Sequence, residues 1–338
     1  MNQSVAEVDI SEISSPEQFL REVGEPCVPV VMRGLVKHWP VTQAAGRSPD
    51  ALKDYLLQFD RGGDVEVFFG DPQIAGKYYY NNDLKGFNFE RRMMPFGDGL
   101  ARIISGMDTP GAPTLYIGSI PINSYLPGLS TENPMPLLSP TVEPRIWLGH
   151  PSNVSFHYDS VDNIACVIAG RRRFTLYSPE LIGRLYVGPI DNTMAGQPVS
   201  LAASAEVDDG RFPLFNEIRD QALTAELEPG DALFLPNLWW HRVESTAPFN
   251  GLINYWWDAF AVGPDSPYTT MLLAMIAISE RPERERRAWR AMFDHYVFRG
   301  GGHPLAHLPA DQHGLLGPLK PDNYGKIRAR VLHMLRTR

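Results

Sequence analysis

The sequence lacks the features that mark several large classes of protein. It contains two cysteines, Cys27 and Cys166, among 338 residues, which is too few for a disulfide framework, so we expect both thiols to be buried. The first fifteen residues carry neither the basic nor the apolar segment that a signal peptide requires. The longest apolar run, 271–278, is far below the roughly 20 residues that span a bilayer. These absences predict a cytoplasmic protein with no membrane partner.

The sequence also has fewer positively than negatively charged residues. The chain has 31 lysines and arginines against 39 aspartates and glutamates, which gives a formal net charge of −8. Proteins that bind phosphate backbones have the opposite balance, so the composition disfavours a nucleic acid as partner. Hydrophobic residues make up 43% and charged residues 21% of the chain, which excludes a disordered or collagen-like protein.

Long regular elements are scarce in the middle of the chain. With 30 prolines and 29 glycines, turns are frequent, and short β-prone runs follow one another over 114–257. This spacing is typical of a β-sandwich or barrel. Helical patterns flank it, beginning at the capping residues Ser15 and Ser48, near 97–105, and after Pro267. We expect three parts: N-terminal helices and strands that pack on a barrel (1–112), the barrel (113–262) and a C-terminal helical segment (263–338).

The sharpest local pattern is a histidine and an aspartate two positions apart, His157 and Asp159. On a strand these side chains point to the same face. A second histidine, His241, follows a turn, an apolar strand and two tryptophans. Two histidines and one carboxylate are the ligands of non-haem Fe(II) oxygenases and leave positions open, whereas a structural zinc site takes four protein ligands. The pair alone is weak evidence, because a strand histidine is more often hydrogen-bonded than metal-bound.

The residues around this pattern resemble those of a known family. The segments that carry the resemblance are 149–159, 162–163, 170–174, 177–180, 228–245 and 254–257, with weaker likeness at 30–35 and 39–40. They resemble the JmjC/cupin-8 family of Fe(II)- and 2-oxoglutarate-dependent oxygenases, with a pattern similar to that of the asparaginyl hydroxylase that inhibits the hypoxia-inducible factor. The resemblance implies a mainly β fold, a double-stranded β-helix (jelly-roll or cupin) core with flanking helices. It also implies iron in the mouth of that core, held by His157, Asp159 and His241.

The resemblance further implies which residues bind the co-substrate, 2-oxoglutarate. In this family a basic residue one strand after the first two ligands pairs with the distal carboxylate, and the matching position is Arg172, where many members have lysine. A guanidinium stays charged and can bind a carboxylate through two N–H groups, so the role survives the exchange. Tyr116 resembles a tyrosine that donates to the same carboxylate. Asn163 and Asn254 resemble residues that line the co-substrate pocket, and Trp256 resembles an aromatic packed near the iron.

Two details around these positions leave questions open. Arg171 and Arg173 flank Arg172, and either neighbour is an alternative anchor, although Arg173 lies on the opposite strand face. Family members often have threonine three residues before the first histidine ligand, and here that position is Val154. On a regular strand Ser155 faces the opposite side from Val154, the position of the threonine. Ser155 can therefore replace the threonine only if a β-bulge intervenes.

These expectations define a dioxygenase that hydroxylates a protein side chain or a small molecule and releases succinate and CO₂. The substrate is open, and so is the choice between hydroxylation and demethylation. We expect the segments 71–112 and 186–219 to shape the substrate cleft. Within the first, the run Tyr78-Tyr79-Tyr80-Asn81-Asn82 offers stacking and amide hydrogen bonds, although a packed loop has the same composition.

Three other interpretations stay open. A non-oxygenase metal cupin that binds or isomerises a small molecule would need no basic residue inside the barrel. A catalytically silent JmjC-like binding module would not need all three ligands. An oxygenase of a free aromatic metabolite differs from a protein hydroxylase only in substrate. The basic helix expected near 324–336 is either a solvated face or a docking helix, so a homodimer through the C-terminal helices is also open.

Overall fold

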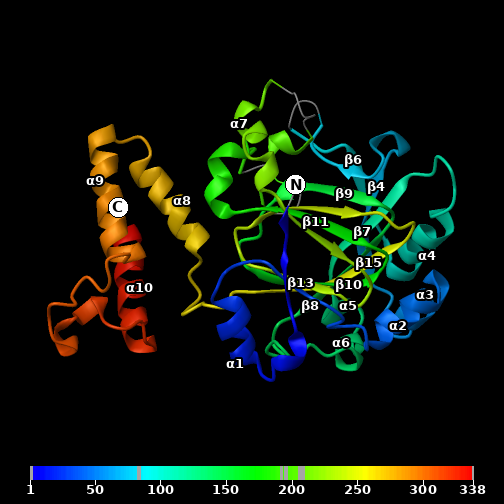
Figure 1. Ribbon diagram of the computed structural model, residues 1–338, viewed down its shortest axis with the longest axis horizontal. Coiled ribbons are helices and arrows are strands. Elements are labelled where there is room, and N and C mark those ends of the chain that lie inside the picture. Colours follow the sequence, from blue (N-terminus) through cyan, green and yellow to red (C-terminus); the bar gives the residue numbers. More distant parts are fainter. Residues whose placement is uncertain (1–2, 82–84, 191–192, 194–196, 205–209, 337–338) are drawn as a thin grey trace. The chain divides into compact units, whose positions relative to one another are not determined.

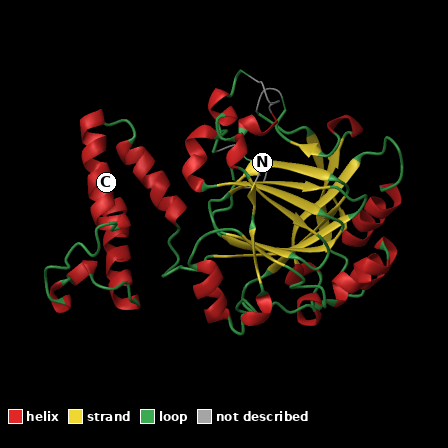
Figure 2. Ribbon diagram, in the orientation of Figure 1, coloured by secondary structure: helices red, strands yellow, loops and turns green. Residues whose placement is uncertain are grey.

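The computed structural model describes residues 3–81, 85–190, 193, 197–204 and 210–336, and the chain forms two compact units, Met1–Ala259 and Phe260–Arg338 (Figure 1). Within the described ranges, no helix is long and apolar enough to cross a membrane. The first unit contains every strand described, and the second is built from helices and turns (Figure 2).

Two mixed sheets form the first unit. In the nine-stranded sheet the order is β2-β3-β13-β10-β15-β8-β7-β4-β6, and in the six-stranded sheet it is β1-β12-β11-β14-β9-β5. The strands are β1 (Gln3–Ser4), β2 (Ala6–Val8), β3 (Val30–Met32), β4 (Asp64–Gly70), β5 (Lys77–Tyr78), β6 (Phe89–Pro95), β7 (Thr114–Pro121), β8 (Pro144–Gly149), β9 (Ser152–His157), β10 (Asp162–Ala169), β11 (Arg172–Tyr177), β12 (Leu223–Leu227), β13 (Ala232–Leu235), β14 (Trp240–Ser245) and β15 (Asn250–Trp257).

The space between the sheets is filled by side chains from both of them. Ala165, Val167 and Leu233 of the larger sheet pack with Phe174 and Leu176 of the smaller one in a single buried cluster. Alternate residues of each strand face inward, as the two-residue period of a strand requires. This arrangement confirms the predicted mainly β fold with a double-stranded β-helix core.

Helices cover the outer face of the larger sheet. Leu52 and Leu56, Leu100 and Ile103 are fully buried there, at the i, i+3 and i+4 spacing of an apolar helix face. Ser48 caps one of these helices, as predicted, through its hydroxyl and the backbone N–H three residues on. The helices of this unit are α1 (Pro16–Phe19), α2 (Pro40–Arg47), α3 (Pro49–Leu57), α4 (Phe96–Gly106), α5 (Ile122–Tyr125), α6 (Leu129–Glu132) and α7 (Pro213–Asn216).

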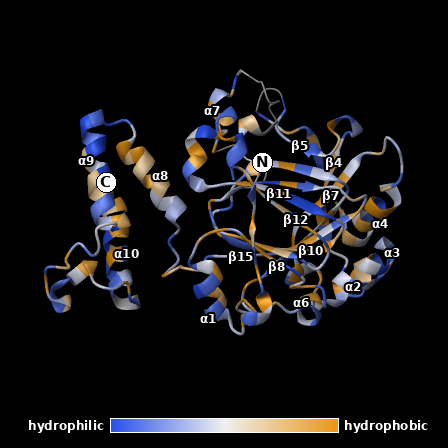
Figure 3. Ribbon diagram, in the orientation of Figure 1, coloured by the Kyte–Doolittle hydropathy of each residue, from blue (hydrophilic) through white to orange (hydrophobic). Residues whose placement is uncertain are grey.

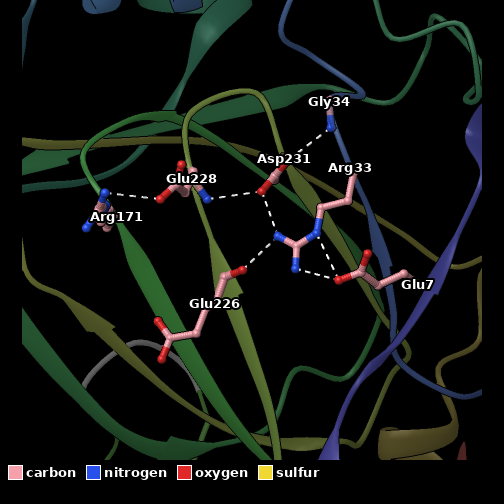
Figure 4. A network of polar contacts seen from close by, with 7 residues as sticks. All are labelled: Glu7, Arg33, Gly34, Arg171, Glu226, Glu228 and Asp231. Carbon is pink, nitrogen blue, oxygen red and sulfur yellow. Dashed lines mark hydrogen bonds and ion pairs between the residues drawn. The ribbon is translucent and has the colours of Figure 1, made fainter.

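A polar network fixes the N-terminal strands to the core (Figure 4). Arg33, directly after β3, donates to Glu7 of β2 at 2.6 Å, to Asp231 at 2.7 Å and to the backbone carbonyl of Glu226 at 2.8 Å. Asp231 also accepts from the backbone N–H of Gly34 at 3.0 Å. The turn before β13 is therefore tied to the strands that enter the fold first.

Two expectations about the first unit are wrong. Cys27 is exposed, because it lies in a turn with a positive φ of 53°, where its backbone carbonyl accepts from the indole of Trp239. Cys166 is buried, as expected. The segment 71–112 contains the helix expected near 97–105, which is α4, but the rest of it is not only loops, because it also contains the strands β5 and β6.

The second unit consists of α8 (Pro267–Ile278), α9 (Glu283–Phe293), α10 (Pro321–Arg336) and connecting turns. The apolar residues of α8 are spread evenly around the helix, whereas α9 is mostly hydrophilic (Figure 3). Asp265 accepts hydrogen bonds from Tyr324 and Arg328, which ties the start of the unit to α10. Neither α8 nor α9 has a fully buried residue.

Candidate metal centre and co-substrate pocket

The three candidate ligands converge at one end of the smaller sheet. His157 ends β9 and lies directly opposite His241 near the start of β14, with ring centroids 4.2 Å apart. Asp159 lies two residues beyond β9. One ligand atom from each of the three lies within 4.8 Å of the others, so a single metal ion can contact all three.

Backbone carbonyls orient both imidazoles. Nδ1 of His157 is 2.8 Å from the carbonyl of Ser155, and Nδ1 of His241 is 2.9 Å from that of Trp239. A carbonyl only accepts, so each Nδ1 carries the proton and each Nε2 keeps its lone pair for a metal. Burial, and then the neighbouring His157, lower the pKa of His241 to about 4, so this ring is neutral at pH 7 as a ligand must be.

The Asp159 carboxylate is held by two donors. Its Oδ2 accepts from the indole of Trp256 at 2.9 Å and from the amide of Asn163 at 3.3 Å, and it lies 3.9 Å from Nε2 of His241. Asn163 in turn accepts from Asn254 at 3.1 Å. The side chains of Asn163, Asn254 and Trp256 therefore lie in the cavity where sequence places them, but they contact one another and the aspartate.

A further residue, Trp147, completes this series of hydrogen bonds. Its indole donates to Oδ1 of Asn254 at 2.6 Å, and its ring meets that of Trp256 edge-on with centroids 5.7 Å apart. The sequence analysis missed Trp147, because it lies on an ordinary β-prone run. No local signal marks Trp147, because its role depends on the pairing of β8 with β15, the strand of Asn254.

Arg172 lies inside the barrel with 2% of its surface exposed. Its Nε and Nη2 atoms have no hydrogen-bond partner, and no carboxylate among the described residues pairs with it. It contacts the hydroxyl of Tyr116, whose pKa is raised by burial. Burial lowers the pKa of Arg172. Its neighbours Arg171 and Arg173 are exposed and form ion pairs outside the barrel, so Arg172 is the inward member of the three.

One cavity joins these groups. Its volume is about 80 Å³, and it is lined by the three candidate ligands, by Arg172 and Tyr116, and by the apolar side chains Val154, Ala165, Phe174, Val243 and Leu252. A buried guanidinium without an anion is costly, because its lost hydration is not replaced. The unpartnered nitrogens of Arg172 therefore fit the carboxylate of a small molecule that also reaches the ligand cluster.

A β-bulge lies beside the first histidine. His157 is opposite His241, but Val154 is opposite Val243, so β9 uses three residues where β14 uses two. The bulge that could have brought Ser155 into the threonine's place is therefore present, but Val154 and not Ser155 lines the cavity. A serine hydroxyl does not replace the family threonine here.

The two segments expected to shape the cleft both reach the strand of the first ligand. β5 pairs with β9 through Lys77 and Tyr78, and Val199 forms a bridge with His157. Within the tyrosine run, Tyr78 and Tyr80 are 6% and 4% exposed and pack on other aromatic rings, so these two cannot stack on a substrate, whereas Tyr79 is half-buried. Asn82 lies outside the described residues.

Comparison with known proteins agrees with this geometry. Residues 16–262 match the family described as a cupin-like domain. The chain is 25% identical over 262 residues to Jumonji C domain-containing protein 5 of Drosophila melanogaster, covering 74% of this chain and 60% of the relative. It is 27% identical over 250 residues (72% and 53%) to Lysine-specific demethylase JMJ30, and 30% identical over 262 residues (68% and 46%) to Lysine-specific demethylase JMJ31, both of Arabidopsis thaliana.

The chain thus spans about half the length of these relatives. The family match, residues 16–262, contains β3 to β15 and every candidate site residue. The family match covers well over half of the chain. The chain therefore belongs to the JmjC/cupin family of Fe(II)- and 2-oxoglutarate-type oxygenases.

Proposed function

We propose that this protein is an Fe(II)- and 2-oxoglutarate-dependent oxygenase that hydroxylates a protein side chain or a small molecule. The observation that carries the proposal is the pairing, in one cavity, of the His157, Asp159 and His241 cluster with a buried guanidinium that lacks an anion. Iron and 2-oxoglutarate, when bound, would together with O₂ supply the oxidation of a substrate C–H bond to C–OH, with succinate and CO₂ as co-products.

Each side chain then has a role that follows from its position. His157, Asp159 and His241 hold the metal on one face and leave the other face open. Arg172 and Tyr116 bind the distal carboxylate of the co-substrate, Arg172 with the two nitrogens that otherwise have no partner. The cavity wall is largely apolar, so water is excluded and the attraction between guanidinium and carboxylate is strengthened.

The alternatives account for less of this arrangement. A metal cupin without 2-oxoglutarate has no use for a buried, unpaired Arg172. A silent binding module needs neither the three converging ligand side chains nor the carbonyls that orient the two imidazoles. The names of two relatives denote lysine demethylation, and removal of an N-methyl group can begin with hydroxylation of its C–H bond, so methyl-lysine peptides belong among the trial substrates.

Turnover of the co-substrate tests the proposal. Metal-free protein is loaded with Fe(II) and supplied with O₂, 2-oxoglutarate and libraries of unmodified and methyl-lysine peptides, and succinate is quantified. We expect succinate release that requires Fe(II) and is lost in His241→Ala. Metal binding without any succinate, with peptides or small aromatic molecules, would favour the metal-cupin alternative.

We also propose that Phe260–Arg338 associates with a second copy of the chain. Among the described residues, 17 of the 24 most exposed large apolar side chains lie in this unit. A helix that is apolar on all sides, as α8 is, normally lies buried, and large exposed apolar patches mark interaction sites. A second copy would supply the same apolar helix in a symmetric contact.

A further inference from the structure

Asp159 differs from the other two candidate ligands in how it is held. His157 and His241 lie on paired strands, and each is fixed by a carbonyl on its own strand segment. Asp159 lies beyond the end of β9, where no strand pairing orients it, although its backbone carbonyl accepts from the N–H of Leu238 at 2.8 Å. The direction of its carboxylate must therefore come from side-chain contacts.

We propose that Trp256 is a positioning residue for the metal site. Its indole N–H, together with the amide of Asn163, holds the Asp159 carboxylate toward the two histidines, and Trp147 and Asn254 hold Asn163 in place. This inference rests on the proposed function, because it takes Asp159 to be a metal ligand. It gives the indole N–H a role, the orientation of the Asp159 carboxylate, in addition to the packing of the ring.

The two donors come from one pair of strands. Trp256 on β15 lies directly opposite Asn163 on β10, and both donate to the same oxygen, Oδ2, at 2.9 Å and 3.3 Å. The indole cannot turn freely, because Trp147 meets it edge-on at 90° and the guanidinium of Arg145 lies 5.9 Å from its ring centre. The direction of the N–H is thus set by packing before any metal arrives.

The second donor is oriented by a chain of buried amides. Asn163 and Asn254 are 6% and 1% exposed, so their polar atoms need partners within the protein. Trp147 can only donate, so Asn254 turns its oxygen to Trp147 and its NH₂ to Asn163, and Asn163 turns its NH₂ to Asp159. One indole N–H therefore fixes both amides in a single orientation that ends on the carboxylate.

The test measures metal affinity and needs no substrate or turnover. Metal-free protein is titrated with Co(II), and binding is followed by visible absorption. We expect Trp256→Phe, which keeps a ring but removes the N–H, to weaken Co(II) binding about 10- to 100-fold, the usual effect of removing a group that orients a metal ligand. Trp147→Phe, which removes the first donor in the series of hydrogen bonds, should lower the Co(II) affinity by a smaller factor.

Trp257→Phe is the matched control. Trp257 is the next residue on the same strand. It packs against the hydrophobic cluster between the larger sheet and its helices, with its ring centroid 6.2 Å from that of Phe234. Its substitution should leave Co(II) affinity unchanged. Circular dichroism verifies that each variant is folded, and Asn163→Ala, which removes the second donor, provides an independent variant should Trp256→Phe be unstable.

The outcomes separate this inference from the proposed function. Wild-type affinity in both Trp256→Phe and Asn163→Ala, with binding lost in His157→Ala, would overturn the positioning role and leave the metal site standing. Absence of Co(II) binding in the wild type, or binding that persists in His157→Ala, would remove the metal site itself and the positioning role with it. An equal loss in Trp257→Phe would also overturn the inference, because it would point to general packing.

Discussion

The two units of this chain treat their apolar side chains in opposite ways. In Met1–Ala259 the helices α3 and α4 bury Leu52, Leu56 and Leu100 against the larger sheet, whereas α8 and α9 of Phe260–Arg338 bury no residue completely. Charge differs as well, since residues 260–338 contain twelve lysines and arginines against seven aspartates and glutamates in a chain that is acidic overall. The first unit buries the apolar faces of its helices, whereas the second leaves exposed the apolar side chains on which the proposed self-association rests.

The same contrast applies to chemistry. Every candidate ligand, the buried arginine and the cavity belong to the first unit. We therefore expect substitutions in the first unit to change metal binding, co-substrate binding or folding, and substitutions on the surface of the second to change association. The predictions that follow test this division, beginning with the largest expected effect.

Removal of one imidazole should abolish the metal site. His241→Ala leaves two ligands, too few to hold Fe(II) at micromolar concentrations, so the bound iron measured after gel filtration should fall to background. Iron retained at one equivalent per chain would show that another group supplies the third ligand.

A buried leucine of α4 should matter to folding far more than an exposed residue of α8. Leu100 is fully buried, so Leu100→Ala should lower the free energy of unfolding by about 2–5 kcal/mol, measured by urea denaturation. Met271→Ala, at a position 42% exposed, should cost less than about 0.5 kcal/mol in dilute solution. Equal losses at the two positions would contradict the contrast between the units.

Acid should destabilise the metal-free protein through His241. Its pKa is about 4 in the folded chain and near 6.5 when unfolded, so between these values the unfolded state binds more protons and stability falls as the pH is lowered. At about 1.4 kcal/mol per pH unit, about 2 kcal/mol of stability should be lost between pH 7 and pH 5, measured by denaturation at pH 7, 6 and 5. His241→Gln should flatten this dependence, and an unchanged slope in that variant would assign it to other groups.

Arg172 and Arg173 are adjacent but should behave differently. Arg172→Ala removes the buried guanidinium and should weaken 2-oxoglutarate binding to the metal-loaded protein about 10- to 100-fold, by calorimetric titration. Arg173→Ala removes an exposed residue paired with Glu226 and should leave this affinity unchanged. The reverse pattern would place the co-substrate elsewhere.

A charge on α8 should alter association and little else. Ile276 is 83% exposed, so Ile276→Glu should leave the metal site intact but convert a dimer to a monomer, seen by sedimentation velocity. Met93→Glu, at an exposed residue of β6 in the first unit, is the control and should leave the mass unchanged. A monomeric wild type at tens of micromolar would contradict the proposed self-association.

Local patterns predicted much of the fold and the candidate site. The caps at Ser15 and Ser48 depend on residues close in sequence, so they could be predicted in advance. The strand period around His157 predicted β9, but Asp159 lies beyond the end of that strand, so the period does not set its direction. The family resemblance singled out Arg172, which the structure shows to be buried. The family resemblance supplied the pairing of His241 with the first two ligands, which no local rule provides.

Long-range contacts account for what was missed. The role of Trp147 depends on the pairing of β8 with β15, and the exposure of Cys27 depends on a turn with positive φ. The bulge that selects Val154 over Ser155 depends on the register between β9 and β14. Each of these follows from how strands from distant parts of the sequence align, which hydrophobic periodicity does not specify.

The most direct test of the central claim is the visible spectrum of the protein under anaerobic conditions. Fe(II) is added to the metal-free protein, followed by 2-oxoglutarate. We predict a charge-transfer band that appears only with both, is absent in His157→Ala, and needs more 2-oxoglutarate in Arg172→Ala. A protein that binds Fe(II) but gives no band at any 2-oxoglutarate concentration would contradict the account.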